Sequence, residues 1–469
     1  MIKKNNPIII VLISTCFVYY WLARGKHSSP HTPSSSLSSH HSRFTDLGTA
    51  EVINRTPQKE SSVIFNDPSV SAKWDLKTTD AEKAWKVSQG SRSIVVAIID
   101  TGCDVKHEDL VHNIWTNPGE SGLDSKGRDK ATNGIDDDGN GFIDDLHGWN
   151  FVANNNNLTD SHGHGTHVAG IIGAEGGNNK GIIGIAPKVS MMILKYYDLK
   201  TPADNLKNTI LAIKYAVKMK ANIINYSGGG IEYSEDEKKA ILEAQNQGIL
   251  FVGAAGNEHT NSDKNKYFPA DYGLANIISV TAIDPNTQVL PSSNYGVETV
   301  HLAAPGQAIY STLPNNTYGP LTGTSQATAF VAGAAAVIMA YKGNFSYEDT
   351  KKYLLATGDG EETLVNKTKT ARKLNLYKAL TMLDSGIGVT GIQAANITNE
   401  TPVFSPDSRL FVNKGGGDSS SERTSSSGAG AAGGSPSSSG LSPGGISSFG
   451  KSLLDAVQKQ PTENKNPKK

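Results

Sequence analysis

The chain has 469 residues but only two cysteines, Cys16 and Cys103. With so few thiols, no disulfide framework can hold the fold together. Charge of one sign is not in excess either, because 44 Lys and Arg residues stand against 45 Asp and Glu residues. This balance argues against a nucleic-acid-binding protein, which carries a basic patch. We interpret Cys103 as a small buried hydrophobic residue and not as a catalytic thiol.

An apolar run lies close to the N-terminus. Lys3 and Lys4 precede residues 8–23, a nearly unbroken apolar stretch of about 16 residues, between the length of a signal-peptide core and that of a full membrane span. Residues 21–24 are bulky and offer no small-residue cleavage site, and Cys16 lacks the small neighbour of a lipoprotein signal. We expect residues 1–25 to be a signal peptide or a membrane anchor. The protein is then exported, and it is either anchored at the cell envelope or secreted.

Composition divides the rest of the chain into four parts. Residues 26–65 are polar and are interpreted as a linker or a short propeptide, and residues 66–384 as the folded domain. Residues 385–413 form a short extension that leans toward β-structure. Residues 414–469 are rich in Gly, Ser and Pro, cannot bury enough surface to fold, and are expected to form a flexible tail.

Within the folded domain, short apolar runs alternate with stretches of helical character. This alternation predicts an α/β fold with a mostly parallel central sheet and helices on both faces. The active site of such a sheet forms at the carboxyl ends of its strands. The expected strands are residues 94–99, 190–195, 223–226, 249–253 and 277–282; the expected helices are residues 166–172, 205–220, 234–247, 326–342, 346–354 and 374–383.

Three short segments each supply one member of a Ser-His-Asp set. The apolar run of residues 94–99 leads into Asp100, His164 opens a run of small and apolar residues, and Ser325 precedes an Ala-rich helical stretch. A hydroxyl at a helix N-terminus lies where free N–H groups favour developing negative charge. Acyl transfer needs such a hydroxyl, a base that takes its proton, and a carboxylate that orients the base.

The order Asp, His, Ser, together with the residues around each, resembles the subtilisin-like serine proteases, or subtilases. The resemblance extends over roughly residues 66–384 and implies a subtilisin-like fold and a monomer. It implies a serine endopeptidase that hydrolyses polypeptide substrates through an acyl-enzyme: Ser325 attacks, His164 transfers the proton and Asp100 orients His164. The segment that follows the nucleophile differs from the family's usual sequence at three positions: Gln326 replaces Met, Ala329 replaces Pro and Phe330 replaces His.

The resemblance also implies an oxyanion donor and a substrate pocket. Asn257 ends the segment 251–257 and matches the Asn whose side-chain amide stabilises the oxyanion in subtilases, a type of donor worth on the order of 10²–10³ in rate. Residues 223–230 resemble the strand to which an extended peptide adds. The implied walls of the S1 pocket contain no acid, so we expect apolar P1 side chains of moderate size, with Tyr267 narrowing the base. These walls are Ser227, Gly228 and Gly229 on one side and Ala254, Ala255 and Gly256 on the other.

Residues 136–145 contain five acids and resemble the start of an EF-hand loop. Oxygen ligands at alternate positions suit a hard cation, and the close negative charges repel one another unless a cation neutralises them. We therefore predict structural calcium at Asp136, Asp138, Asn140 and Asp145. A second calcium site is implied by the family resemblance at Asp67, Asp109 and Asn178.

Other interpretations of the same residues are weaker. Residues 162–167 read H-x-H-x-x-H, as in some zinc hydrolases, but Thr166 occupies the position where that class needs an Asp. Residues 100–102 match the aspartic-protease tripeptide, yet those enzymes need two such carboxylates and no second copy is present. An anchored binding module that kept the fold without activity is the alternative outside the enzymes. It is disfavoured because all four catalytic positions are present.

Overall fold

The computed structural model describes residues 65–70, 73–201, 203–343 and 345–384. Within these residues, nine strands form one sheet in the order β10-β11-β7-β6-β5-β4-β1-β3-β2, in which only β10 and β11 pair antiparallel. A separate hairpin is formed by β8 (Ile309–Leu313) and β9 (Thr317–Leu321). The strands of the sheet are β1 (Gly90–Asp100), β2 (Gly148–Asn150), β3 (Lys188–Lys195), β4 (Ile223–Tyr226), β5 (Leu250–Ala254), β6 (Ile277–Ile283), β7 (Leu302–Pro305), β10 (Asp359–Gly360) and β11 (Arg372–Lys373).

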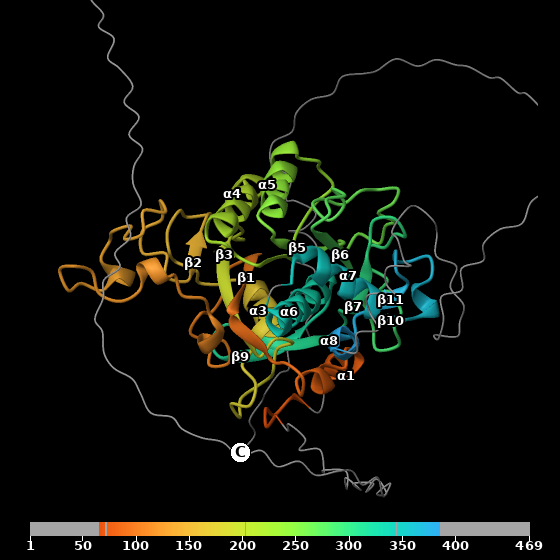
Figure 1. Ribbon diagram of the computed structural model, residues 1–469. Coiled ribbons are helices and arrows are strands. Elements are labelled where there is room, and N and C mark those ends of the chain that lie inside the picture. The colour runs from red at the N-terminus through yellow and green to blue at the C-terminus, as the bar shows by residue number, and fades with distance from the viewer. Residues whose placement is uncertain (1–64, 71–72, 202, 344, 385–469) are drawn as a thin grey trace, which may run out of the picture. The chain divides into compact units, whose positions relative to one another are not determined.

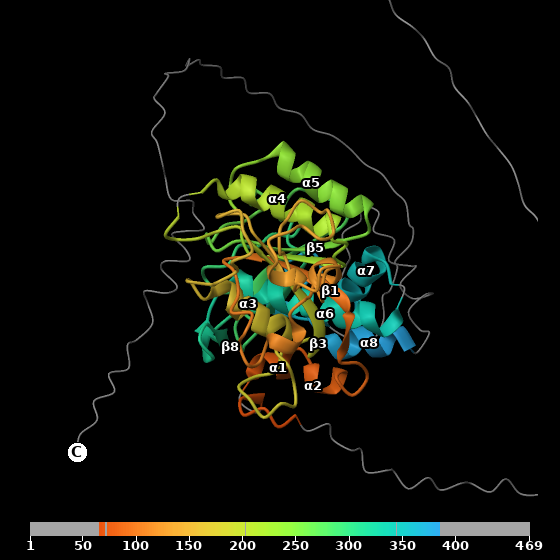
Figure 2. The same ribbon diagram turned by 90° about the vertical axis from the view of Figure 1, so that its left-hand side faces the viewer.

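The central strands β4, β5 and β6 are buried along their whole length because both faces of the sheet are covered. In β1, Val96 and Ile98 belong to one hydrophobic cluster, while Ala97 and Ile99 belong to the other. This division follows from the two-residue period of a strand, which points successive side chains to opposite faces. Helices α3 and α6 lie on one side of the sheet, and α4 and α5 lie together on the opposite side (Figures 1 and 2).

Several helices begin at residues with side chains that cap them. Asp204, Ser234 and Ser346 each accept a hydrogen bond from a backbone N–H in the first turn of α4, α5 and α7, which satisfies a donor that the helix leaves unpaired. The helices are α1 (Trp74–Thr78), α2 (Ala81–Ala84), α3 (His164–Gly173), α4 (Asn205–Lys218), α5 (Glu235–Asn246), α6 (Thr324–Lys342), α7 (Tyr347–Thr357) and α8 (Leu376–Asp384); short 3₁₀ turns cover Val111–Asn113, Pro118–Glu120, Lys130–Thr132 and Glu362–Leu364.

The expected α/β fold with a mostly parallel sheet and helices on both faces is confirmed. Each of the five expected strands matches an observed strand to within a few residues, and each expected helix matches an observed one. The short strands β2, β7, β10 and β11 and the β8–β9 hairpin were not expected. The expected N-terminal signal or anchor, the extension 385–413 and the tail 414–469 lie outside the described residues, and the expected domain boundaries stay predictions.

Among the described helices, α6 is the one long and apolar enough to cross a membrane. It is also buried from Thr324 to Met339, and it packs against β1, β4, β5, β6 and β7. Its apolar composition is therefore explained by its place under the sheet, since a helix that is hydrophobic all round is a buried one.

Candidate active site

Three neighbouring strands bring the main predicted residues to one edge of the sheet. β5, β4 and β1 lie side by side and run parallel, so their carboxyl ends meet at the same edge. Asp100 is the last residue of β1, Ser227 follows β4, and Asn257 follows β5 by three residues. This is the edge at which parallel sheets form their sites.

Asp100 and His164 form a buried pair. His164 is the first residue of α3, and its Nδ1 lies 2.7 Å from Oδ1 of Asp100, which is 2% exposed. Burial by itself disfavours the imidazolium, but the Asp100 charge and hydrogen bond outweigh it, and the net pKa of His164 is raised above its usual 6.5. The close approach depends on Gly165, because a Cβ there would lie 2.1 Å from the Gly102 carbonyl oxygen.

A second buried carboxylate holds the turn that leads to His164. Asp160 accepts hydrogen bonds from the backbone N–H groups of His162, Gly163 and Thr166 and from the hydroxyl of Thr101 at 2.9 Å. Burial favours the neutral acid, but these donors outweigh it and lower the pKa of Asp160. Sequence reasoning missed this residue. Its signal was an Asp shortly before a helix, the usual position of a turn and cap residue.

Ser325 lies in the first turn of α6, against the segment that follows β4. Its Oγ donates to the carbonyl oxygen of Ser227 at 3.0 Å, and Oγ of Ser227 donates back to the Ser325 carbonyl at 3.2 Å. Ser325 is 4% exposed. The predicted nucleophile is thus fixed beside the strand expected to bind substrate, with free backbone N–H groups of the first turn around it.

The amide of Asn257 is held in one orientation by the residue before Ser325. Its Oδ1 accepts from the backbone N–H of Thr324 at 3.0 Å and from the Thr324 hydroxyl at 3.2 Å. With the oxygen engaged, Nδ2 is the end of the amide that can donate to a ligand. Asn294 supports the loop, because its side chain donates to the Ala255 carbonyl and accepts from the N–H of Glu258.

The two expected walls of the pocket lie at the ends of the adjacent strands β4 and β5. From the sequence we expected no acid to receive Lys or Arg, but the carboxylate of Glu258 lies against Gly256, where a Cβ would be 2.4 Å from its Oε2. Asn294 donates to the same oxygen at 2.8 Å. Burial raises the pKa of Glu258, and the bond from Asn294 offsets part of that increase.

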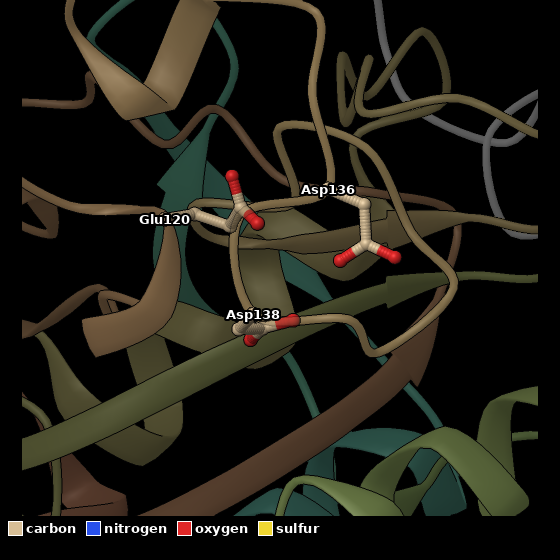
Figure 3. A group of neighbouring side chains, drawn as sticks. All are labelled: Glu120, Asp136 and Asp138. Carbon is tan, nitrogen blue, oxygen red and sulfur yellow. The ribbon is translucent and has the colours of Figure 1, made fainter. Parts of the chain in front are cut away.

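The acidic loop is completed by a residue from outside it. Ligand atoms of Glu120, Asp136 and Asp138 lie within 4.8 Å of one another, and the three carboxylates point toward a common space (Figure 3). Glu120 is fully buried; its Oε1 accepts from the Asp137 N–H, while its Oε2 has no hydrogen-bond partner among the described residues. Burial raises the pKa of Glu120, and the charges of neighbouring acids add to the effect. A buried carboxylate oxygen without a partner, beside two other carboxylates, suits a hard cation.

Asn140 and Asp145, predicted as ligands, are hydrogen-bonded to each other, and Asn140 also bonds to Asp136 and Asp138. Asp145 accepts hydrogen bonds from the side chains of Asn117, Asn140 and Tyr215, so its charge is met by three donors. Asn140 donates its backbone N–H to both Asp136 and Asp138. Both residues therefore shape the loop. Sequence reasoning missed Glu120, which lies 16 positions before Asp136 and carries no spacing signal.

The structure also brings Asp67, Asp109 and Asn178 together. Asp67 accepts from the backbone N–H of Asn178 at 3.1 Å, and the Asn178 side chain donates to Asp109 at 2.8 Å. The pKa of Asp67 is raised, first by burial and also by the charge of Asp109. Three segments distant in sequence thus meet at two carboxylates.

The histidines of the H-x-H-x-x-H pattern do not converge on one point. Nδ1 of His164 is engaged by Asp100, whereas Nε2 of His167 lies 2.9 Å from the carbonyl oxygen of Ile309 and 3.1 Å from that of Gly319. Burial lowers the pKa of His167 to about 3. His167 is therefore a buried neutral residue that ties α3 to the β8–β9 hairpin, and the zinc interpretation is not supported.

Comparison with known proteins identifies one family. A family model described as "Subtilase family" matches residues 91–378. Subtilisin-like protease 2 of Plasmodium falciparum is 30% identical over 323 residues, which cover 68% of this chain and 22% of that protein. The major intracellular serine protease of Bacillus subtilis (strain 168) is 35% identical over 269 residues, 57% of this chain and 75% of that protein. Subtilisin-like protease 1 of Plasmodium falciparum (isolate 3D7) is 34% identical over 304 residues, 61% of this chain and 43% of that protein. The chain thus spans less than half the length of these two Plasmodium relatives.

Proposed function

This chain belongs to the subtilase family, and from that premise we propose that it is a serine endopeptidase that cleaves polypeptides with Ser325 as nucleophile. Oγ of Ser325 attacks the peptide carbonyl carbon while its proton passes to Nε2 of His164. The tetrahedral intermediate then expels the amine, which takes that proton, and leaves an acyl-enzyme on Ser325. Water, deprotonated by His164 in the same way, releases the acid and restores Ser325.

The observation that carries this proposal is the buried 2.7 Å contact between Asp100 and Nδ1 of His164. It fixes the ring so that Nε2, on the opposite side, is the nitrogen that exchanges the proton. It also stabilises the imidazolium that forms during attack, because an opposite charge at hydrogen-bond distance favours the charged form.

We assign the oxyanion site to Nδ2 of Asn257 and the backbone N–H of Ser325. Thr324 holds Oδ1 of Asn257 by two hydrogen bonds. Nδ2 is therefore already oriented to donate to the oxyanion, and the side chain need not move during the reaction. Preorganised donors of this kind stabilise the charge that develops in the transition state. The residues after β4 and β5 bind the extended substrate on either side of its P1 side chain.

Activity on unstructured peptides tests the proposal. The purified chain should cleave them, and Ser325→Ala should reduce kcat by at least about 10⁴-fold, leaving only the contribution of binding and the oxyanion site. Ser292→Ala is the matched control, because Ser292 is exposed and should leave the rate unchanged. Full cleavage by Ser325→Ala would refute the assignment.

We further propose that calcium stabilises the fold at the acidic loop. Glu120, Asp136 and Asp138 would hold the ion, supported by the unpartnered buried oxygen of Glu120. Asn140 and Asp145 would position the loop. Asp67, Asp109 and Asn178 would hold a second ion, supported by the convergence of two carboxylates and an amide from three segments. Calcium has no part in the bond cleavage and acts by binding the native state alone.

Thermal unfolding tests the calcium sites. A ligand at about 100 times its Kd adds ~2.7 kcal/mol to the free energy of unfolding, so a chelator should lower Tm. The pair Asp136→Ala with Asp138→Ala should remove part of that response, and the exposed acids Glu82→Ala with Glu243→Ala should remove none. An unchanged Tm on chelation would argue against both sites.

A further inference from the structure

One aromatic ring spans the gap between the two segments assigned to the S1 pocket. A Cβ placed on Gly229 would lie 2.5 Å from Cε1 of Tyr267, and one placed on Gly256 would lie 3.0 Å from its Cδ2. Cε1 and Cδ2 are opposite corners of the same six-membered ring. The Tyr267 ring therefore touches both walls at once, and the glycines at these positions are what let it fit.

The backbone that carries the ring is fixed by hydrogen bonds of its own segment. The next residue, Phe268, pairs with Gly230 through two backbone hydrogen bonds of 2.8 and 2.7 Å. The Tyr267 N–H donates to the Asp271 carboxylate at 2.8 Å, and the Asp271 N–H donates to the Tyr267 carbonyl at 3.0 Å. Tyr267 is 3% exposed. These bonds fix the backbone that carries the ring, and rotating the buried ring out of its place would open a void in close-packed surroundings, so the ring stays in place when substrate binds.

This position lies next to the proposed nucleophile. Oγ of Ser325 donates to the Ser227 carbonyl, two residues from Gly229. A P1 side chain that enters between the two walls therefore meets the Tyr267 ring. Resting on the proposed function, we propose that Tyr267 closes the floor of the S1 pocket and restricts this enzyme to substrates with Gly, Ala or Ser at P1. This replaces the expectation of moderate-sized P1 side chains.

Glu258 does not convert the pocket into a site for basic side chains. Its carboxylate lies beside Gly256 and is already paired with the Asn294 amide. The long side chain of a P1 Lys or Arg must extend into the S1 pocket before its charge can reach a carboxylate, and the Tyr267 ring fills that space. The size of the P1 side chain, and not its charge, therefore sets which substrates the enzyme prefers.

A set of peptides that differ only at P1 tests this. We expect the wild type to cleave the Ala peptide with a kcat/KM at least about 100-fold above those of the Phe and Lys peptides, as expected for steric rejection in a closed pocket. Tyr267→Gly should raise kcat/KM for the Phe peptide at least about tenfold. Tyr267→Phe, which keeps the ring, should keep the order Ala above Phe. Cleavage of the Phe peptide by the wild type as fast as the Ala peptide would overturn the proposal.

A second measurement needs no variant. Peptidyl phosphonates that carry Ala or Phe as the P1 analogue should label wild-type Ser325 at rates that differ in the same direction. Faster labelling by the Phe reagent overturns the role of Tyr267 while leaving the proposed function intact. Failure of the wild type both to react with either reagent and to cleave any peptide overturns the proposed function, and the pocket assignment with it.

Discussion

At the scale of single residues, the imidazole of His164 is under two opposing influences. Burial favours its neutral form, whereas the Asp100 carboxylate 2.7 Å away favours the charged form and prevails, so the pKa of His164 is raised. A base must be neutral to accept a proton from Ser325. Activity should therefore appear as the pH rises through this raised pKa, which places the acid limb of the rate profile above pH 6.5.

Asp100→Asn tests this balance. The substitution keeps the shape of the side chain but removes its charge, so burial, the largest influence on His164, outweighs the remaining charge of Asp160 and lowers the pKa of His164. We expect the acid limb of kcat/KM to move to lower pH, and kcat to fall by about 10⁴-fold because the ring loses its oriented partner. Rate profiles from pH 4 to 9 measure both. An acid limb that stays in place would contradict the assigned role of Asp100.

Sequence reasoning was weakest for residues whose role is to position or complete other functional groups. Asp100, His164, Asn257 and Ser325 could be proposed from the sequence because each lies at or just after the end of an apolar run, or at the start of a helical one. Asp160 and Glu120 were not, because their roles depend on which donors and carboxylates the loops bring near them. The orientation of Tyr267 was also hidden, since only the fold shows that both walls meet one ring.

At the scale of elements, the long apolar runs determined what could be predicted. Strands such as β1 and β6 are buried on both faces along much of their length, so most of their buried residues are apolar. The strands β10 and β11 have two residues each; β11 joins the sheet by pairing with β7, and β10 joins it by pairing with β11. Two residues are too few to show an alternating or apolar sequence pattern. Such a strand forms because a neighbouring strand offers it hydrogen bonds, and its own sequence does not predict it.

The first turn of helix α5 contains a buried carboxyl group, that of Glu237, whose pKa affects the stability of the fold. Burial raises the pKa of Glu237 to about 7, although the Tyr272 hydroxyl donates to it at 2.6 Å and lowers it in part. The native state therefore binds the proton more tightly than the unfolded chain, in which a Glu titrates near its ordinary 4.5. Stability contributed by this group is present below pH 4.5 and is lost as the pH rises toward 7.

Glu237→Gln should remove the loss of stability at higher pH, because the Gln amide stays neutral at every pH. We expect the variant to gain stability relative to the wild type as the pH rises from 5 to 8, by up to roughly 3 kcal/mol. Denaturant unfolding at several pH values measures the difference. Glu243→Gln, an exposed position on the same helix, should show no such trend. Parallel stability curves for Glu237→Gln and the wild type would contradict the assignment.

At the scale of the whole described domain, the fold brings together residues that are far apart in the chain. Asp100 and Ser325 belong to elements separated by most of the domain, and they meet because α6 lies under β1 and begins at the carboxyl end of the sheet. The acidic loop follows β1 in the chain, and the second proposed calcium site joins Asp67, which precedes β1, to Asp109 and Asn178, which follow it. A cation at either position would stabilise the surroundings of the Asp100 strand.

The most direct test of the central claim is the identity of the residue that a phosphonylating serine reagent modifies. Intact mass and peptide mapping should show one adduct, located on Ser325, and His164→Ala should slow its formation by several orders of magnitude because the hydroxyl loses its base. Ser325→Ala should take up no reagent. A single adduct on another serine, or equal labelling of Ser325→Ala and the wild type, would contradict the account.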